Sequence, residues 1–348
     1  MISKNYIAIP PGATIKEQLE DRGMIQRDFA SRMNLSEKHV SKLINGQSQL
    51  TQDVAYRLEM VLGIPASFWN NLESIYRQNL TKVEKENEMD QDIEISRKIS
   101  YNEISKLGWI EETRKPKERV VNLRKFFEIT TLELLAENAP MQIACRKLNE
   151  ANKEDLNLLV WAQKAKLEAR NIPVKPINID GLKRSLNEIR ALTTSKDSHF
   201  SIDLQQKLAN LGIALVYLPH LPGSFLHGAT FYDSKKIVIG LTLRGKDADR
   251  FWFSLFHEIG HIILGHINDN LGLTEHHEYE ADVFARDILI PPDEYDLYIQ
   301  NHDIGYDTVK NFAEKINISP GVVVGRLQKE GKIGYNQLND LKIRYDFN

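Results

Sequence analysis

The chain has 348 residues, enough for two or three domains, with 42% hydrophobic and 27% charged residues. This composition is typical of a soluble globular protein, and a net charge of −3 excludes wholesale wrapping of nucleic acid and binding to a membrane surface. The first residues (MISKNYIAIPPGAT) lack the apolar run of a signal peptide, and no segment approaches the length of a membrane span. Cys145 is the single cysteine, which precludes an internal disulfide, so we expect a cytoplasmic protein.

The first eighty residues have the pattern of a five-helix domain that contains a helix-turn-helix. One short helix begins at Ile25, Asn34 suits a left-handed turn, and a second helix follows Ser36, a good N-cap, and ends at Gly46. Three further helices are expected over residues 14–22, 51–62 and 65–80. A domain of this kind inserts the start of its second helix into the major groove of DNA.

Three local features of this region are specific. They are Pro11-Gly12 before the first helix, Asn45-Gly46 after the second helix of the pair, and GIPASFWNNL at residues 63–72. With these features the region resembles the Xre family of DNA-binding domains and, within it, the HigA-type antitoxins. The resemblance implies that four side chains face the bases, namely Ser36, Glu37, Lys38 and Lys42. It implies that Gln26 and Asn45 face the phosphates.

The charge of this region bears on its mode of binding. Residues 1–80 contain nine Lys and Arg against eight Asp and Glu, so the domain has little electrostatic attraction for DNA. A nearly neutral domain binds weakly as a monomer. We therefore expect a homodimer on the paired half-sites of a double-stranded operator.

The middle of the chain carries no motif that indicates a chemistry. Ten of the eighteen residues over 81–98 are charged, so residues 81–99 are expected to form an exposed helix or a linker. Residues 100–175 are expected to form a helical middle region that includes 141–145, with Trp161 in its core. This region could sense a ligand, dimerise the protein or separate its two ends. Pro173 and Pro176 mark the boundary with the last domain, residues 176–348.

The last domain begins with segments typical of a small β-sheet. Residues 212–217, 227–232 and 236–241 are rich in β-branched side chains and are bounded by glycine or proline. The whole chain is therefore expected to be mainly α with a small β-sheet (α+β). A sheet in this position could bind an extended peptide by adding it as one more strand.

The segment Phe256 to His261 contains the pattern H-E-x-x-H. On a helix, His257 and His261 project from the same face, so both imidazoles can reach one metal ion. Glu258 is then placed to take a proton from a water activated by that metal. The surrounding residues 249–266 are apolar nearly all round the helix, which predicts burial, and buried polar groups need partners. A metal ion would satisfy all three side chains.

A catalytic zinc site needs a third protein ligand and an open fourth position. The helical segment after the motif offers Glu278, which we predict as that ligand, and Asp282, which could accept a hydrogen bond from the outer nitrogen of a ligand histidine. Glu280 is a competing ligand, although on a regular helix it points about 160° away from Glu278. The sequence does not indicate which group stabilises the tetrahedral intermediate. Four neighbours are candidates, but such residues are more often solvated surface than catalytic, so none is assigned this role: His266, His276, His277 and Tyr279.

Residues 228–291, with the two motifs above, resemble the ImmA/IrrE family of metallopeptidases. That family is similar to thermolysin-like zinc peptidases, so the resemblance implies a zincin-like C-terminal peptidase domain. It implies Zn²⁺ held by His257, His261 and Glu278, with Glu258 as general base and Asp282 hydrogen-bonded behind the ligands. Members of the family are associated with cleavage of a partner repressor, often a helix-turn-helix regulator of stress or mobile-element genes.

Together these observations predict a DNA-binding transcriptional regulator fused to a zinc-dependent metallo-endopeptidase. Its protein substrate would be a repressor, a toxin or the chain itself. The alternative is an antitoxin-type autorepressor in which the zinc-peptidase fold senses a signal or holds a partner without proteolysis. Glu258 weighs against this alternative, because a structural site needs no general base. A third possibility is a peptidase fold without metal. A second helix-turn-helix outline, over 309–316 and 320–328, is expected to serve packing, because Val322, Val323 and Val324 stand where polar groups are needed.

Overall fold

The computed structural model describes residues 6–87, 89–137, 143–144, 153–195, 200–222, 227–242, 247–269, 273–301 and 303–345. The chain divides into two compact units, residues 1–93 and 94–348, each with its own core. Within the described residues, no helix combines the length and the apolar character that crossing a membrane requires.

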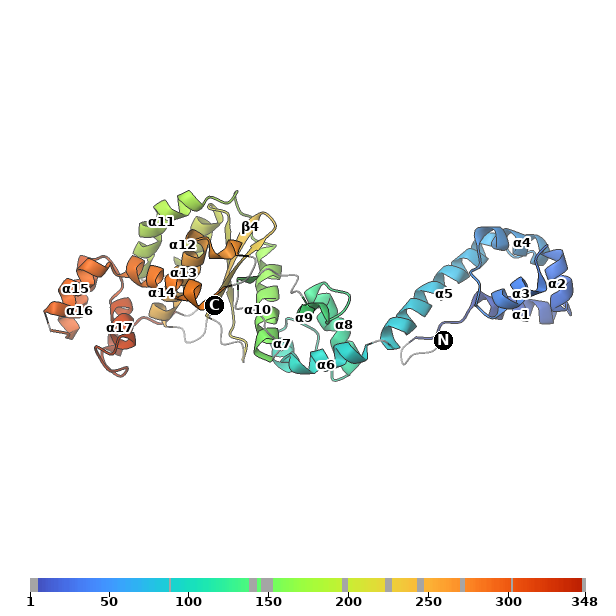
Figure 1. Cartoon of the computed structure of the whole chain (residues 1–348), viewed down its shortest axis with the longest axis horizontal. Coiled ribbons are helices and arrows are strands. Elements are labelled where there is room, and N and C mark those ends of the chain that lie inside the picture. Colours follow the sequence, from blue (N-terminus) through green and yellow to red (C-terminus); the bar gives the residue numbers. More distant parts are fainter. Residues whose placement is uncertain are drawn as a thin grey trace. The chain divides into compact units, whose positions relative to one another are not determined.

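The N-terminal unit consists of five helices around a small apolar core (Figure 1). These are α1 (Pro11–Asp21), α2 (Gln26–Arg32), α3 (Glu37–Ile44), α4 (Gln52–Leu62) and α5 (Ala66–Asn87). The fully buried core side chains include Ile15, Phe29, Val40, Leu58 and Trp69. Because Phe29 and Val40 come from α2 and α3, the core fixes the angle between the two helices of the helix-turn-helix.

The local signals of this unit act as predicted. Asn34 adopts a left-handed conformation with φ 52°, and Gly46 ends α3 with φ 70°. The Ser36 hydroxyl accepts a hydrogen bond from the His39 N–H (3.2 Å) and so caps α3. The fifth helix is longer than predicted: α5 continues to Asn87, because Val83 is fully buried against Tyr76 and Ala8. The charged segment that follows contains a further helix, α6 (Asp90–Lys98).

The second unit is built around α13 (Ala248–Ile263), the helix that carries the H-E-x-x-H motif. The preceding α-helices are α7 (Tyr101–Lys106), α8 (Pro116–Phe127), α9 (Leu134–Glu137), α10 (Lys153–Ala169), α11 (Ile179–Ala191) and α12 (Phe200–Ala209). Those that follow are α14 (Glu275–Leu289), α15 (Pro292–Gln300), α16 (Tyr306–Lys315) and α17 (Pro320–Lys329). Val322, Val323 and Val324 of α17 are buried, which confirms that this segment serves packing.

A mixed four-stranded sheet has the order β1-β3-β4-β2. Its strands are β1 (Ile143–Ala144), β2 (Ile213–Leu218), β3 (Gly228–Asp233) and β4 (Lys236–Thr242). β2 runs parallel to β4, whereas β3 is antiparallel to β4 and to β1. The prediction of helix over residues 141–145 was wrong for Ile143 and Ala144. Backbone pairing with the edge of β3, with Ile143 opposite Phe231, overrides a weak local preference. Cys145 lies outside the described residues.

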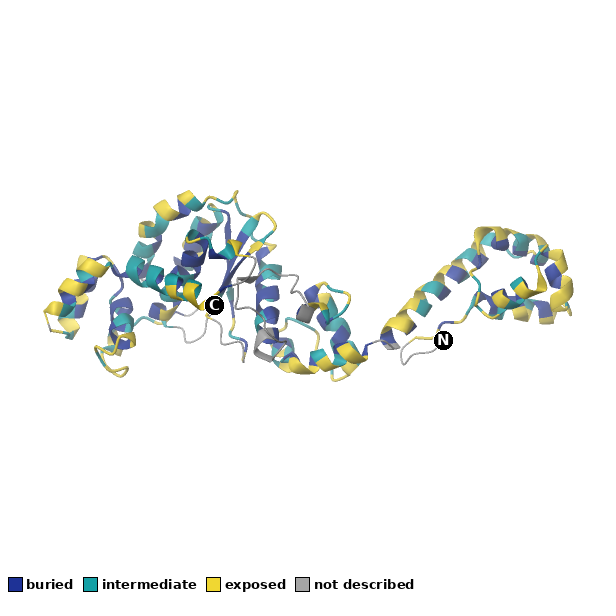
Figure 2. Cartoon of the chain, in the orientation of Figure 1, coloured by how far each residue is buried: buried dark blue, intermediate teal, exposed yellow. Residues whose placement is uncertain are grey.

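The two faces of the sheet are covered by different helices. On one face, Trp161 of α10 is fully buried against Gly240, and its indole N–H donates to the Pro219 carbonyl (3.2 Å). On the other face, Ile237, Ile239 and Leu241 of β4 pack in the same core as the apolar residues of α13. In Figure 2 strands β2 and β4 are coloured almost entirely as buried. One face of the sheet thus supports the motif helix.

Candidate metal centre and nucleic-acid interface

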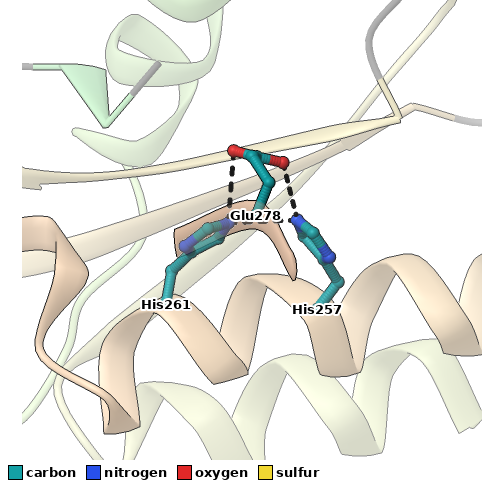
Figure 3. A group of neighbouring side chains, drawn as sticks. All are labelled: His257, His261 and Glu278. Atoms are coloured by element: carbon teal, nitrogen blue, oxygen red, sulfur yellow. Dashed lines mark hydrogen bonds and ion pairs between the residues drawn. The ribbon is translucent and has the colours of Figure 1, made fainter. Parts of the chain in front are cut away.

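The two histidines of the motif meet above α13. They are one helical turn apart, and their Nε2 atoms lie 3.0 Å from each other. His261 has 2% of its side chain exposed and His257 has 16%. Figure 3 shows both rings projecting from α13 towards the same point.

Helix α14 brings Glu278 to that point. Its carboxylate oxygens lie 3.3 Å from His257 Nε2 and 3.7 Å from His261 Nε2, so it bridges the two rings (Figure 3). The start of α14 is fixed by a capping box in which the Thr274 hydroxyl accepts from the His277 N–H (3.2 Å). Since Glu278 follows in the next position of this first turn, the cap also fixes its direction. Glu278 is 38% exposed, so the cluster is accessible to solvent.

The three side chains fit a divalent metal ion. One ligand atom from each lies within 4.8 Å of the others, and among the described residues this is the single group of three or more His, Cys, Asp or Glu side chains with such geometry. Two nitrogens bound about 2.0–2.1 Å from one tetrahedral zinc would be about 3.4 Å apart, close to the separation found. Two imidazoles and one carboxylate are also a common protein donor set of a catalytic zinc site.

The outer nitrogens of both rings have partners. His257 Nδ1 lies 2.9 Å from Asp282 Oδ1, the contact that the sequence predicts for Asp282. His261 Nδ1 lies 3.1 Å from Nδ1 of His266, which is buried, whereas solvated surface is the more common role for such a residue. Glu280, the competing ligand, instead contacts His266 Nε2 (3.3 Å) and His276 Nε2 (3.6 Å).

Glu258 lies between the motif helix and the sheet. It is 6% exposed, and its Oε2 accepts a hydrogen bond of 2.5 Å from the hydroxyl of Thr230 on β3. Burial raises the pKa of Glu258 to about 7, against the opposing effects of His257 and of the Thr230 hydroxyl. Gly228 makes room for this carboxylate, since a Cβ there would lie 2.5 Å from Glu258 Oε1. The sequence offered no signal for Thr230 or Gly228, because their proximity depends on the packing of β3 against α13.

In the metal-free protein the pKa values of the two histidines are shifted in opposite directions. Burial lowers the pKa of His257, but hydrogen bonds with Asp282 and Glu278 outweigh it and raise the value to about 10. Burial and the neighbouring positive charge of His257 lower the pKa of His261 to about 4. Burial raises the pKa of Asp282, but the hydrogen bond with His257 and the positive charges of Lys329 and His257 together outweigh it and lower the value. At neutral pH the metal-free pair therefore carries one net positive charge, on His257.

The residues predicted to contact DNA lie on α2 and α3 or at their ends. All six are exposed: Gln26, Ser36, Glu37, Lys38, Lys42 and Asn45. Gln26 opens α2, Ser36 caps α3, and Asn45 follows its last residue. Glu37 pairs with Arg27 at 3.8 Å, so part of its charge is compensated within the unit. Their positions are compatible with insertion of α3 into a groove, and their contacts with bases or phosphates remain predictions.

Two family models match separate parts of the chain. Residues 15–69 match a family model described as helix-turn-helix, and residues 211–328 match one described as IrrE N-terminal-like domain. A similar protein is the uncharacterized HTH-type transcriptional regulator YddM of Escherichia coli (strain K12), 32% identical over 75 residues. The aligned part covers 22% of this chain and 78% of that regulator.

Proposed function

Because the chain belongs to the Xre-type helix-turn-helix regulators and carries a C-terminal IrrE N-terminal-like (ImmA/IrrE) domain, we propose that it is a transcriptional regulator with a fused zinc-dependent metallo-endopeptidase. One observation carries the proposal: the convergence of His257, His261 and Glu278, with the buried carboxylate of Glu258 beside them. A site built only to stabilise the fold would not require that fourth side chain.

In this proposal His257, His261 and Glu278 hold Zn²⁺, and Asp282 orients His257 through its Nδ1–H. When bound, the ion supplies Lewis-acid chemistry: it acidifies a water and polarises a peptide carbonyl. Glu258 removes a proton from the attacking water and later returns it to the leaving amine. Its pKa is about 7 in the metal-free protein, and a bound cation would lower it and so favour the carboxylate that accepts the proton. Thr230 holds one carboxylate oxygen and leaves Oε1 for the proton.

We propose a protein substrate: a repressor bound to the same operator, a cognate toxin or the chain itself. The fusion motivates this choice, since a DNA-binding domain concentrates the peptidase at an operator. Binding as a homodimer would compensate for the weak electrostatic attraction of a nearly neutral domain.

A second candidate is an antitoxin-type autorepressor whose peptidase fold holds a partner without cleaving it. The observation in its favour is strand β1. Residues 143–144 of the same chain pair with the edge of β3, the strand that carries Thr230. An extended peptide that added to this edge would have to displace them.

The test is incubation of the purified full-length protein with the products of its own operon, with and without a zinc chelator. Metallopeptidase activity predicts a discrete cleavage that the chelator stops and that added Zn²⁺ restores. Stable binding of a partner without cleavage in the zinc-loaded protein would reject the peptidase and favour the autorepressor.

A further inference from the structure

His266 is buried and held in place by its neighbours, unlike a residue of the solvated surface. It is 7% exposed and lies in the short 3-10 helix η2 (His266–Asn268) that follows α13. Gly265 before it has φ 81°, a left-handed conformation that turns the chain back beneath the motif helix. The imidazole of His277 stacks on that of His266, with ring centroids 4.5 Å apart and an interplanar angle of 18°. The fold therefore clamps His266 in one orientation.

Hydrogen-bond accounting then fixes the tautomers along a chain of three side chains. His261 must keep Nε2 free of a proton to serve as a metal ligand, so its proton is on Nδ1. That N–H points at His266 Nδ1, 3.1 Å away, which must accept and so carries no proton. His266 is then protonated on Nε2, and this N–H donates to Glu280 Oε2 at 3.3 Å.

The two ligand histidines are thus supported differently. His257 donates directly to the carboxylate of Asp282 at 2.9 Å, whereas His261 reaches the carboxylate of Glu280 only through His266. In both cases the acceptor fixes the ring and keeps Nε2 directed at the cluster. A histidine that was merely buried and satisfied by Glu280 would not need to present Nδ1 to His261.

We propose that His266 and Glu280 are positioning residues for His261, and that they set its tautomer and thereby the affinity of the cluster for Zn²⁺. This inference rests on the proposed function, since it assumes that His257, His261 and Glu278 bind the metal. His266 and Glu280 themselves do not contact the substrate or the metal in this proposal.

The experiment tests the roles of the two ring nitrogens of His266 separately, in the full-length protein. In His266→Asn the amide can replace Nδ1 as acceptor, whereas in His266→Gln it can replace only Nε2. Zn²⁺ affinity is measured by chelator competition, and the Co²⁺-loaded protein is compared by its visible absorption spectrum. We expect His266→Gln and His266→Phe to bind Zn²⁺ about 10–100-fold more weakly, with an altered Co²⁺ spectrum. His266→Asn should stay within about threefold of the wild type, because it retains the acceptor.

The control is His276→Ala. Its imidazole also contacts Glu280 but is 74% exposed, so Zn²⁺ affinity should not change. Thermal unfolding in the presence of chelator shows whether each metal-free variant folds. If His266→Phe does not fold, the comparison of His266→Asn with His266→Gln still tests the inference. Equal Zn²⁺ affinity of His266→Asn and His266→Gln, or wild-type affinity of His266→Phe, would overturn the inference alone. Failure of the wild type to bind Zn²⁺ would overturn the proposed function, and this inference with it.

Discussion

The two units present their functional side chains in opposite ways. In the helix-turn-helix unit, the residues predicted to contact DNA are exposed, although Ser36 also caps α3. In the second unit, Glu258 and His261 are buried, and each must find a hydrogen-bond partner or a metal. An exposed side chain need not contact any other group of the protein, so the fold does not determine its role. A buried polar side chain is constrained by its surroundings, which makes its role testable from the structure.

The largest expected effect is on the cleavage rate, from a change at the buried Glu258. Glu258→Gln removes the proton acceptor while its shape is retained, so cleavage should slow by about 10²–10⁴-fold. Zn²⁺ binding and DNA binding should not change, because the metal ligands and α3 are untouched. The initial rate of substrate cleavage gives the measurement, and Glu275→Gln in the exposed first turn of α14 is the control. Full turnover by Glu258→Gln would reject Glu258 as the general base.

Gly228→Ala should disturb the same carboxylate from the sheet side. The added methyl would meet Glu258 Oε1 at 2.5 Å, so the carboxylate must move. A displacement of this size lowers catalytic rates by about 10²-fold, while Zn²⁺ binding persists. The control is Gly305→Ala, where the nearest atom to the added methyl lies at 3.7 Å. If Gly228→Ala cleaves at the wild-type rate, the position of Glu258 does not limit catalysis.

The site residues that could be predicted from the sequence are those whose positions depend on local pattern. His257, His261 and Glu278 could be found because helical periodicity and the requirement for a third ligand constrain the choice. His266, Thr230 and Gly228 could not, since their contacts depend on a chain reversal at Gly265 and on how β3 packs against α13. Strand β1 was missed for a similar reason: two residues carry too little pattern, and the partner strand lies far along the chain. Turns and caps such as Asn34 and Ser36 were predictable because their causes are local.

Substitutions of exposed lysines on α3 should lower the affinity for DNA without lowering the stability of the N-terminal unit. Lys38→Ala and Lys42→Ala should each weaken binding to the operator by about tenfold, as expected for loss of a base contact of about 1–3 kcal/mol. Thermal unfolding should stay unchanged, since both side chains are exposed. Fluorescence anisotropy with operator DNA measures the effect. Lys16→Ala, whose lysine pairs with Glu20 on the same helix, serves as control. Equal loss in Lys16→Ala would show that only general charge matters.

The smallest effect is on stability. The Thr51 hydroxyl accepts the Val54 N–H (3.3 Å) and caps α4, so Thr51→Ala should destabilise the N-terminal unit by about 1 kcal/mol. Urea unfolding measures the change, with Gln52→Ala at the next exposed position as control. Peptidase activity should be unaffected. A cleavage defect in Thr51→Ala would show that the two units are energetically coupled.

The most direct measurement is the zinc content of the purified wild-type protein beside Glu278→Ala and Glu275→Ala. We predict about one equivalent of zinc per chain in the wild type and in Glu275→Ala, and less than about half an equivalent in Glu278→Ala. Undiminished zinc in Glu278→Ala, or a wild type that takes up none, would contradict the assignment of a metal centre to His257, His261 and Glu278.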